Sequence, residues 1–161
     1  GPEKTVQMLS DVFNALDALA AKHDIEKIKT VGDCYMAVAG VPASSPKHLT
    51  QIADFALDTG AFISEYRAKS GNDIRLRTGI HSGPVVAGVL GTSKFAYDLW
   101  GEVVNVASRM ESSAEPDQIQ VTDTIQKSLC LNYTFEKRGD IEIRNMGSVT
   151  TWYLTGHVTE R

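Results

Sequence analysis

The stretch that decides the fold is Glu26-Lys27-Ile28-Lys29-Thr30-Val31-Gly32-Asp33-Cys34-Tyr35-Met36-Ala37. Residues alternate in the manner of a strand from Ile25 to Thr30, and a second short apolar run extends from Cys34 to Ala39. Two such runs joined by a turn that contains glycine predict a β-hairpin. The sequence therefore predicts a hairpin that carries Asp33 near its tip.

Helical periodicity lies on both sides of this hairpin. Apolar residues recur at three- and four-residue intervals from Val6 to Ala21, from Leu49 to Tyr66 and from Glu102 to Ser112. This spacing is typical of amphipathic helices. A shorter fourth helix is expected from Thr122 to Leu129, with an acidic residue in its first turn.

Strand-like runs occupy residues 74–80, 85–90, 118–121, 133–137 and 149–155, whereas residues 95–100 are short and mixed in character. Helices interspersed with hairpins, rather than strict alternation of strand and helix, favour an α+β sandwich with a largely antiparallel sheet. Helices would cover one face of that sheet. An apolar second face would be covered by another copy of the chain.

The length and charge of the chain restrict the function classes. A chain of 161 residues fits one domain over residues 1–161 and is long enough to bury a core. Its formal net charge of −4 has both signs interspersed, which is not the footprint of a nucleic-acid-binding protein. No apolar run approaches the roughly 20 residues that a membrane-spanning helix needs, so these residues are expected to be soluble. Cys34 and Cys130 are expected to be reduced thiols packed in the core.

Three long motifs together resemble the class III nucleotide cyclase family. They are EKIKTVGDCYMA at residues 26–37, RTGIHSGPVVAG at 77–88 and YDLWGEVVNVASRME at 97–111, in the family order. The resemblance runs from about Val6 to Gly156 and is strongest to the mammalian-type subclass, which includes mycobacterial membrane-anchored adenylate cyclases. It implies a ferredoxin-like (palm-type) α+β sandwich with a mainly antiparallel sheet covered by helices, lacking the family's first strand.

The resemblance implies conversion of ATP to 3′,5′-cyclic AMP and pyrophosphate. Attack of the ribose 3′-hydroxyl on the α-phosphate calls for two divalent ions, Mg2+ or Mn2+, held by carboxylates. Asp33 matches the second metal-binding aspartate of the family, whereas the first lies upstream of the opening helix. With one carboxylate absent, residues 1–161 alone are expected to show little or no cyclase activity.

The same resemblance implies that Lys29 and Asp98 recognise the base. A lysine that donates to adenine N1 and an aspartate that accepts from the N6 amine match the adenine edge, and guanine presents the reverse pattern. Guanylate cyclases of the family place a glutamate and usually a cysteine at these positions. The residues present therefore favour ATP.

The third motif implies catalytic roles for Asn105 and Arg109, which stand four residues apart on one helix face. Asn105 resembles the residue that orients the ribose, and Arg109 resembles the one that stabilises charge on the phosphate. Arg144 stands where the family often has a lysine that contacts the terminal phosphates. Asn145 and Met146 break that pattern.

The resemblance also implies a homodimer whose active sites lie at the subunit interface. Asp33 of one copy would face Lys29, Asp98, Asn105 and Arg109 of its mate. The expected location is the cytoplasm, with any membrane attachment supplied by segments outside these residues.

Two other readings stay open beside the enzyme. Without the flanking motifs, Asp33 would be read as a turn residue and Lys29 as an exposed strand lysine. The first alternative is a non-catalytic, cyclase-like module that serves dimerisation or regulation. The second is a palm-fold diguanylate cyclase, which needs a Gly-Gly-Asp/Glu-Glu-Phe-type hairpin that the tip Val31–Tyr35 does not match.

Overall fold

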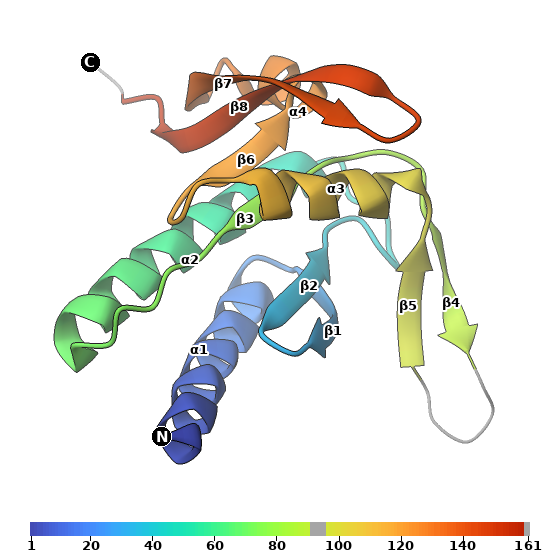
Figure 1. Ribbon diagram of the computed structural model, residues 1–161. Helices are drawn as coiled ribbons and strands as arrows, with labels where there is room; N and C mark the ends of the chain where they lie inside the picture. The colour runs from blue at the N-terminus through green and yellow to red at the C-terminus, as the bar shows by residue number, and fades with distance from the viewer. Residues whose placement is uncertain (91–95, 160–161) are drawn as a thin grey trace. The chain divides into compact units, whose positions relative to one another are not determined.

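The computed structural model describes residues 1–90 and 96–159. The chain divides into two compact units (Figure 1). Unit 1 comprises Gly1–Asp73 with Gly88–Asp98, and unit 2 comprises Ile74–Ala87 with Leu99–Arg161. The predicted single domain over residues 1–161 stays a prediction.

Unit 1 contains two long helices and the predicted hairpin. Helix α1 spans Pro2–Lys22, strands β1 and β2 span Glu26–Val31 and Cys34–Val38, and helix α2 spans His48–Ser70. Helix α1 buries Val12, Leu16 and Ala20, which recur every four residues as the periodicity predicts. Helix α2 ends at Gly71, whose φ of 75° gives the left-handed conformation that glycine adopts without steric cost.

The hairpin packs against both helices of unit 1. Ala20 of α1, Ile25 before β1 and Phe55 of α2 form a buried cluster, and Tyr35, Ala37 and Ala39 pack on it. Burial of these side chains removes apolar surface from water, which is the main stabilising contribution to such a core. The hairpin is thus attached to a helical layer within unit 1.

Unit 2 is built on a four-stranded sheet with the order β3-β6-β8-β7. Its elements are β3 Thr78–Ile80, α3 Glu102–Ser113, β6 Ile119–Thr122, α4 Asp123–Leu129, β7 Tyr133–Ile143 and β8 Gly147–His157. Strand β3 pairs with β6 in parallel, whereas β6–β8 and β7–β8 are antiparallel. Helix α3 packs against β3 and β6, and α4 packs against β6 and β8.

Strands β4 Val86–Leu90 and β5 Ala96–Trp100 form a separate two-stranded sheet. The boundary between the units crosses both strands. The hairpin β1–β2 is also a sheet of its own. The α+β class and the predominance of antiparallel pairing are confirmed, while the strands of the described residues are divided among three sheets.

Several element boundaries differ from the sequence-based expectation. Residues 74–77 are not in a strand, because the Leu76 carbonyl accepts from the Asp117 amide (2.6 Å) and Arg75 pairs with the Asp117 carboxylate (2.7 Å) instead of joining a ladder. Residues 96–100 form β5, whereas Phe95 lies outside the described residues. Strands β7 and β8 are longer than expected because β7 continues through an irregularity between Lys137 and Gly139.

The prediction of two core cysteines is wrong, because Cys34 and Cys130 are both exposed. Cys34 opens β2 directly after the hairpin turn, and Cys130 follows the last residue of α4. Neither position is covered by the apolar neighbours that surround it in the sequence. No helix in the described ranges is long and apolar enough to cross a membrane.

Candidate active site

The hairpin turn presents Asp33 to solvent. Val31 pairs with Cys34, so Gly32 and Asp33 form a two-residue turn, and Gly32 has a φ of 60°. A positive φ in a two-residue hairpin turn is the conformation that glycine favours. Asp33 lies at the tip of the hairpin, as the sequence predicted, and it is exposed there. Its carboxylate is accessible to a ligand.

Lys29 lies on β1 beside an irregularity in the hairpin ladder. Lys27 pairs with Ala37 and Lys29 pairs with Met36, so Ile28 is an extra residue on β1. A bulge of this kind changes the direction of neighbouring side chains and is frequent next to functional sites. The local geometry therefore sets the direction of the Lys29 side chain.

The structure brings Lys29 and Asp98 together within unit 1. Lys29 Nζ donates to Asp98 Oδ2 at 2.8 Å, from β1 to β5, across 69 positions of sequence. The Lys29 side chain is 46% exposed and that of Asp98 is 19% exposed. A donor and an acceptor thus lie side by side at the surface of unit 1, within reach of a planar ligand edge that carries the complementary pair.

Helix α3 in unit 2 carries Asn105 and Arg109, both exposed. Their spacing of four residues places them on one side of the helix, one turn apart. The opposite side contributes Val106 and Met110, which are 1% and 0% exposed, to the core. The helix therefore buries an apolar side and exposes a polar one, as expected of the amphipathic helix that the spacing predicts.

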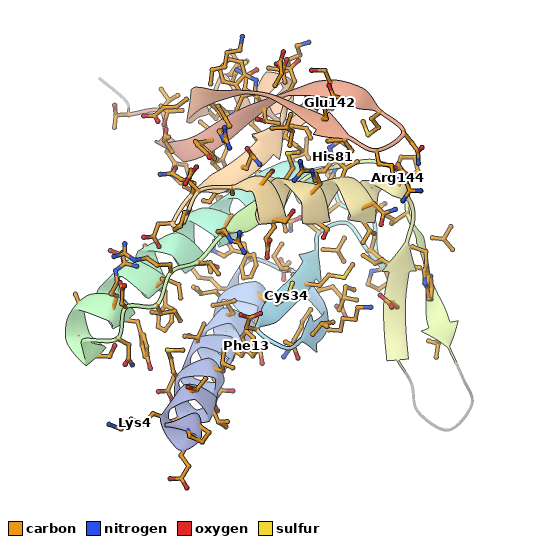
Figure 2. All side chains as sticks on the ribbon, viewed as in Figure 1. Lys4, Phe13, Cys34, His81, Glu142 and Arg144 are labelled. Carbon is orange, nitrogen blue, oxygen red and sulfur yellow. The ribbon has the colours of Figure 1, made fainter. Side chains whose placement is uncertain are left out.

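The C-terminal end of β7 lies beside α3. Val106 and Met110 pack with Ile143 in one buried cluster. Arg109 Nε donates to the Glu142 carbonyl oxygen at 3.4 Å, two residues before the exposed Arg144. The loop that carries Arg144 therefore begins next to the helix that carries Arg109, within unit 2 (Figure 2).

A buried glutamine holds the other end of α3 on the sheet. Gln120 of β6 is fully buried, and its Nε2 donates to the Met110 carbonyl at 2.8 Å and to Ser113 Oγ at 2.7 Å. Thr151 Oγ1 donates to Gln120 Oε1 at 3.4 Å. These bonds satisfy carbonyl and hydroxyl groups at the helix end that would otherwise be buried without partners.

Helix α3 lies directly against the backbone of β3 at Gly79. A methyl group added there would overlap backbone atoms of Ala107, Met110 and Glu111. His81 follows on the same segment, and its Nδ1 lies 2.7 Å from Thr122 Oγ1 at the end of β6. Burial lowers the pKa of His81, so the imidazole is held in its neutral form.

The predicted site residues thus fall into two groups. Unit 1 carries Asp33, Lys29 and Asp98, of which the last two are in contact. Unit 2 carries Asn105, Arg109 and Arg144 around the start of α3 and the end of β7. The sequence did not predict that the backbone carbonyl of Glu142 accepts a hydrogen bond from Arg109. Every residue has a backbone carbonyl, so the residue type at position 142 gives no indication of this contact.

No metal-binding cluster is complete within the described part of the chain. Among the described residues, no three or more His, Cys, Asp or Glu side chains lie close enough together to hold a metal ion. The Asp33 carboxylate is a hard oxygen ligand of the kind that Mg2+ and Mn2+ prefer. It fits as one ligand of a metal site, and the described residues do not supply the remainder.

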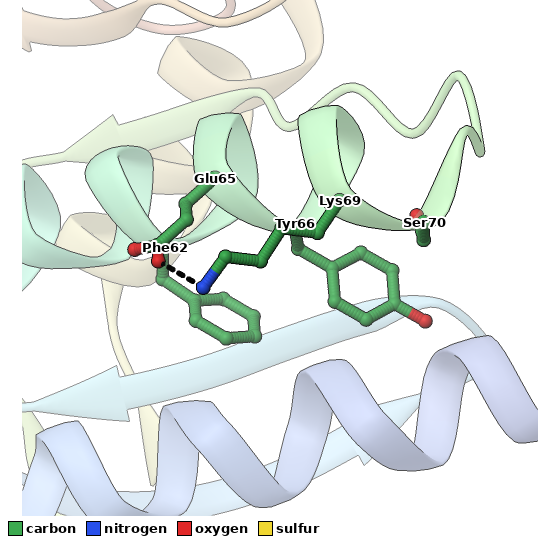
Figure 3. A pocket seen from close by; sticks show the side chains of 5 residues that line it. All are labelled: Phe62, Glu65, Tyr66, Lys69 and Ser70. Atoms are coloured by element: carbon green, nitrogen blue, oxygen red, sulfur yellow. Dashed lines mark ion pairs between the residues drawn. The ribbon is translucent and has the colours of Figure 1, made fainter.

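A hollow on the surface of unit 1 lies away from the predicted site residues of that unit. Its volume is about 380 Å³, and its walls come from one face of α2 (Figure 3). The rings of Phe62 and Tyr66 lie with their centroids 5.8 Å apart, and Lys69 pairs with Glu65 at 2.6 Å. None of the predicted site residues lines it, so this hollow does not support a nucleotide site.

Similarity to known proteins agrees with the motifs. An adenylate cyclase of Mycobacterium tuberculosis is 44% identical over 155 residues, which are 96% of this chain and 35% of the relative. The guanylate cyclase soluble subunit beta-2 of Rattus norvegicus is 40% identical over 95% of this chain and 23% of its own length. The chain spans about a third of these relatives or less.

A solved structure shows the same fold. The guanylate cyclase domain of a protein from Catenaria anguillulae, in complex with GTP, matches with a TM-score of 0.91 and 30% identity over 98% of this chain and 87% of that one. A family model described as the adenylate and guanylate cyclase catalytic domain matches residues 1–156. The chain therefore belongs to the adenylate and guanylate cyclase catalytic domain family.

Proposed function

We propose that the chain is the catalytic domain of an adenylate cyclase that converts ATP to 3′,5′-cyclic AMP and pyrophosphate in signal transduction. One observation carries the choice of ATP: Lys29 Nζ and Asp98 Oδ2 lie 2.8 Å apart. Relatives in this family include enzymes named for either nucleotide, so family membership alone does not choose the base. The two side chains make that choice.

The adenine edge presents an acceptor at N1 next to a donor at N6. Lys29 donates and Asp98 accepts, so the pair complements this edge, whereas guanine presents a donor at N1 next to an acceptor at O6. With guanine, the lysine would face an N–H and the carboxylate would face an oxygen. Unpaired polar groups of this kind are the strongest source of discrimination in a binding site.

The residues of unit 2 act on the sugar and the phosphates. Asn105 orients the ribose through its amide, and Arg109 places a guanidinium near the α-phosphate, where negative charge increases during the reaction. The hydrogen bond from Arg109 Nε to the Glu142 carbonyl leaves the terminal nitrogens of the guanidinium as donors to phosphate. Arg144 adds a second cation for the terminal phosphates.

Asp33 is the metal-binding residue of this proposal. Divalent ions at such a site would lower the pKa of the 3′-hydroxyl and offset charge on the leaving pyrophosphate. Because the described residues complete no metal cluster, we expect residues 1–161 on their own to be weakly active or inactive. The alternative of a non-catalytic dimerisation module predicts that the full-length protein is inactive too.

The site is shared between two copies of the chain. In a symmetric homodimer, Asp33 of one copy would act with Lys29, Asp98, Asn105 and Arg109 of the other. Two equivalent sites result, because a two-fold interface uses the same surface twice. Dimerisation is then a requirement of the reaction.

The test exchanges the base-reading pair in the full-length protein. Lys29→Glu combined with Asp98→Cys should lower the turnover of ATP and raise that of GTP, because the exchanged side chains offer an acceptor to guanine N1–H and remove the acceptor for adenine N6. Formation of cyclic AMP and cyclic GMP from an equimolar mixture of ATP and GTP measures both. Unchanged use of ATP would show that the base is read by other residues.

A further inference from the structure

A single carboxylate on α1 holds both strands of the hairpin that carries Lys29. Tyr35 Oη donates to Asp17 Oδ1 at 2.8 Å, and Lys27 Nζ lies 3.0 Å from the same oxygen. Tyr35 belongs to β2 and Lys27 to β1. Lys27 Nζ also donates to Asp17 Oδ2 at 3.3 Å. The Asp17 carboxylate therefore links the helix to each strand of the hairpin.

Tyr35 is held by more than this hydrogen bond. Its ring lies 5.8 Å from that of Phe13 on α1 and 6.4 Å from that of Phe55 on α2, measured between centroids (Phe13 is labelled in Figure 2). The Lys27 ammonium lies 5.3 Å from the Tyr35 ring centroid, in the range of a cation–π contact. Burial and the bond to Asp17 raise the pKa of Tyr35, so the phenol stays protonated as a donor.

The anchored residues flank Lys29 on both strands. Lys27 lies two positions before Lys29 on β1, and Tyr35 pairs with Thr30, the residue after Lys29. The ladder itself is irregular between Lys27 and Lys29. A bulge leaves one residue without backbone hydrogen bonds to the neighbouring strand. Side-chain contacts outside the hairpin therefore have more influence on the conformation of β1 near Lys29.

We propose that Asp17 is a positioning residue that fixes the hairpin on α1 so that the Lys29 ammonium is held at Asp98, and thereby contributes to the choice between ATP and GTP. The inference rests on the proposed function and names a residue that acts through Lys29. Asp17 does not touch the nucleotide.

The cluster contributes more to geometry than to stability. The side chains of Asp17 and Lys27 are 43% and 38% exposed, and ion pairs at that exposure stabilise a fold little because water screens them. A substitution at Asp17 should therefore leave the protein folded while the hairpin becomes more mobile. Loss of selectivity can then be separated from loss of structure.

Helix α1 offers a matched control. Asp11 accepts from Tyr66 Oη at 3.2 Å, so it also joins a helix carboxylate to a tyrosine. That tyrosine belongs to α2 and not to the hairpin. Asp11→Ala removes a contact of the same chemistry without touching the attachment of Lys29.

The experiment compares Asp17→Ala, Asp17→Asn and Tyr35→Phe with Asp11→Ala in the full-length protein. The readout is the ratio of kcat/KM for ATP to that for GTP, together with amide hydrogen exchange over residues 26–38. We expect Asp17→Ala to lower the ratio about fivefold, mainly through a higher KM for ATP, as couplings within one hydrogen-bond network allow. Asp17→Asn, which keeps an acceptor for Tyr35, should retain part of the selectivity.

Each outcome decides the question. Faster exchange in residues 26–38 with a lower ratio in Asp17→Ala and Tyr35→Phe, but not in Asp11→Ala, supports the proposal. Faster exchange with an unchanged ratio overturns it, provided that Lys29→Glu does change the ratio in the same assay. If Lys29→Glu leaves the ratio unchanged, the proposed function fails and the role of Asp17 fails with it.

Discussion

The exchange of Lys29 and Asp98 is the prediction that the structure specifies most closely. Lys29→Glu alone removes the donor to adenine N1 and places a second carboxylate beside Asp98. Asp98→Cys alone removes the acceptor for N6 and leaves the lysine unpaired. The double exchange avoids the repulsion between carboxylates, so it should be less damaging than the sum of the single changes.

The magnitude follows from the two hydrogen bonds to charged side chains. Such bonds contribute about 1.5–3 kcal/mol each, and the partial exposure of Lys29 places this pair at the lower end. Loss of both contacts costs about 3 kcal/mol, which corresponds to about 150-fold in kcat/KM for ATP. In Lys29→Glu the new carboxylate would lie a few ångströms from the Asp98 carboxylate. Repulsion between these like charges should make kcat/KM for ATP at least as low in that single variant.

The assay measures initial rates of cyclic AMP and cyclic GMP formation over a range of ATP and GTP concentrations. The control exchanges Lys22→Glu with Asp58→Cys, a second lysine–aspartate pair of unit 1 at 3.2 Å. That exchange repeats the change of charge at a position outside the proposed site. A ratio of ATP to GTP use that shifts less than about threefold in the Lys29 and Asp98 double variant would refute the assignment.

The remaining predictions concern unit 2. Gln120→Leu should lower the free energy of unfolding by about 1–3 kcal/mol, because the buried Met110 carbonyl loses the hydrogen bond that Gln120 Nε2 donates. The control is Gln126→Leu, at a partly exposed position, which should change the free energy of unfolding by less than about 0.5 kcal/mol. Urea denaturation measures both, and equal values would contradict the role of Gln120. Because burial lowers the pKa of His81, the unfolded chain binds a proton more readily than the folded one. The stabilising contribution of neutral His81 is therefore present above the unfolded pKa of about 6.5 and decreases as the pH falls below it, by at most about 1.4 kcal/mol per pH unit. His81→Gln should flatten the decline of the urea midpoint between about pH 7 and pH 5.5, and an unchanged slope would contradict this.

Helices were the most predictable part of the fold. Val12, Leu16 and Ala20 recur with the period of a helix, and burial of that side follows directly from the spacing. The hairpin was equally clear, since the Gly32-Asp33 turn separates two short strands. Local sequence fixes these elements because their geometry depends on neighbours along the chain.

Strand limits and burial were less predictable. Strand β7 continues past Lys137 because Gly139, at a φ of 126°, adopts a conformation that other residues avoid. The exposure of Cys34 and Cys130 depends on which elements cover a turn or a helix end. Local hydrophobicity does not contain that information.

The candidate site depended on resemblance rather than on pattern. No periodicity links Lys29 to Asp98, which lie 69 residues apart, and only the motifs placed them in one function. Asp17 escaped notice because a polar residue on the outer side of a helix is ordinary. Its contact with both hairpin strands is visible only in three dimensions.

The central claim, a nucleotide site shared by two copies, is tested most directly by complementation. Full-length Asp33→Ala and Arg109→Ala proteins should each be nearly inactive, because each homodimer lacks one side of both sites. After the two are mixed and allowed to exchange subunits, the account predicts recovery of about a quarter of the unaltered activity, since half of the dimers would then hold one intact site. Continued inactivity of a mixture in which heterodimers are shown to form would contradict the account.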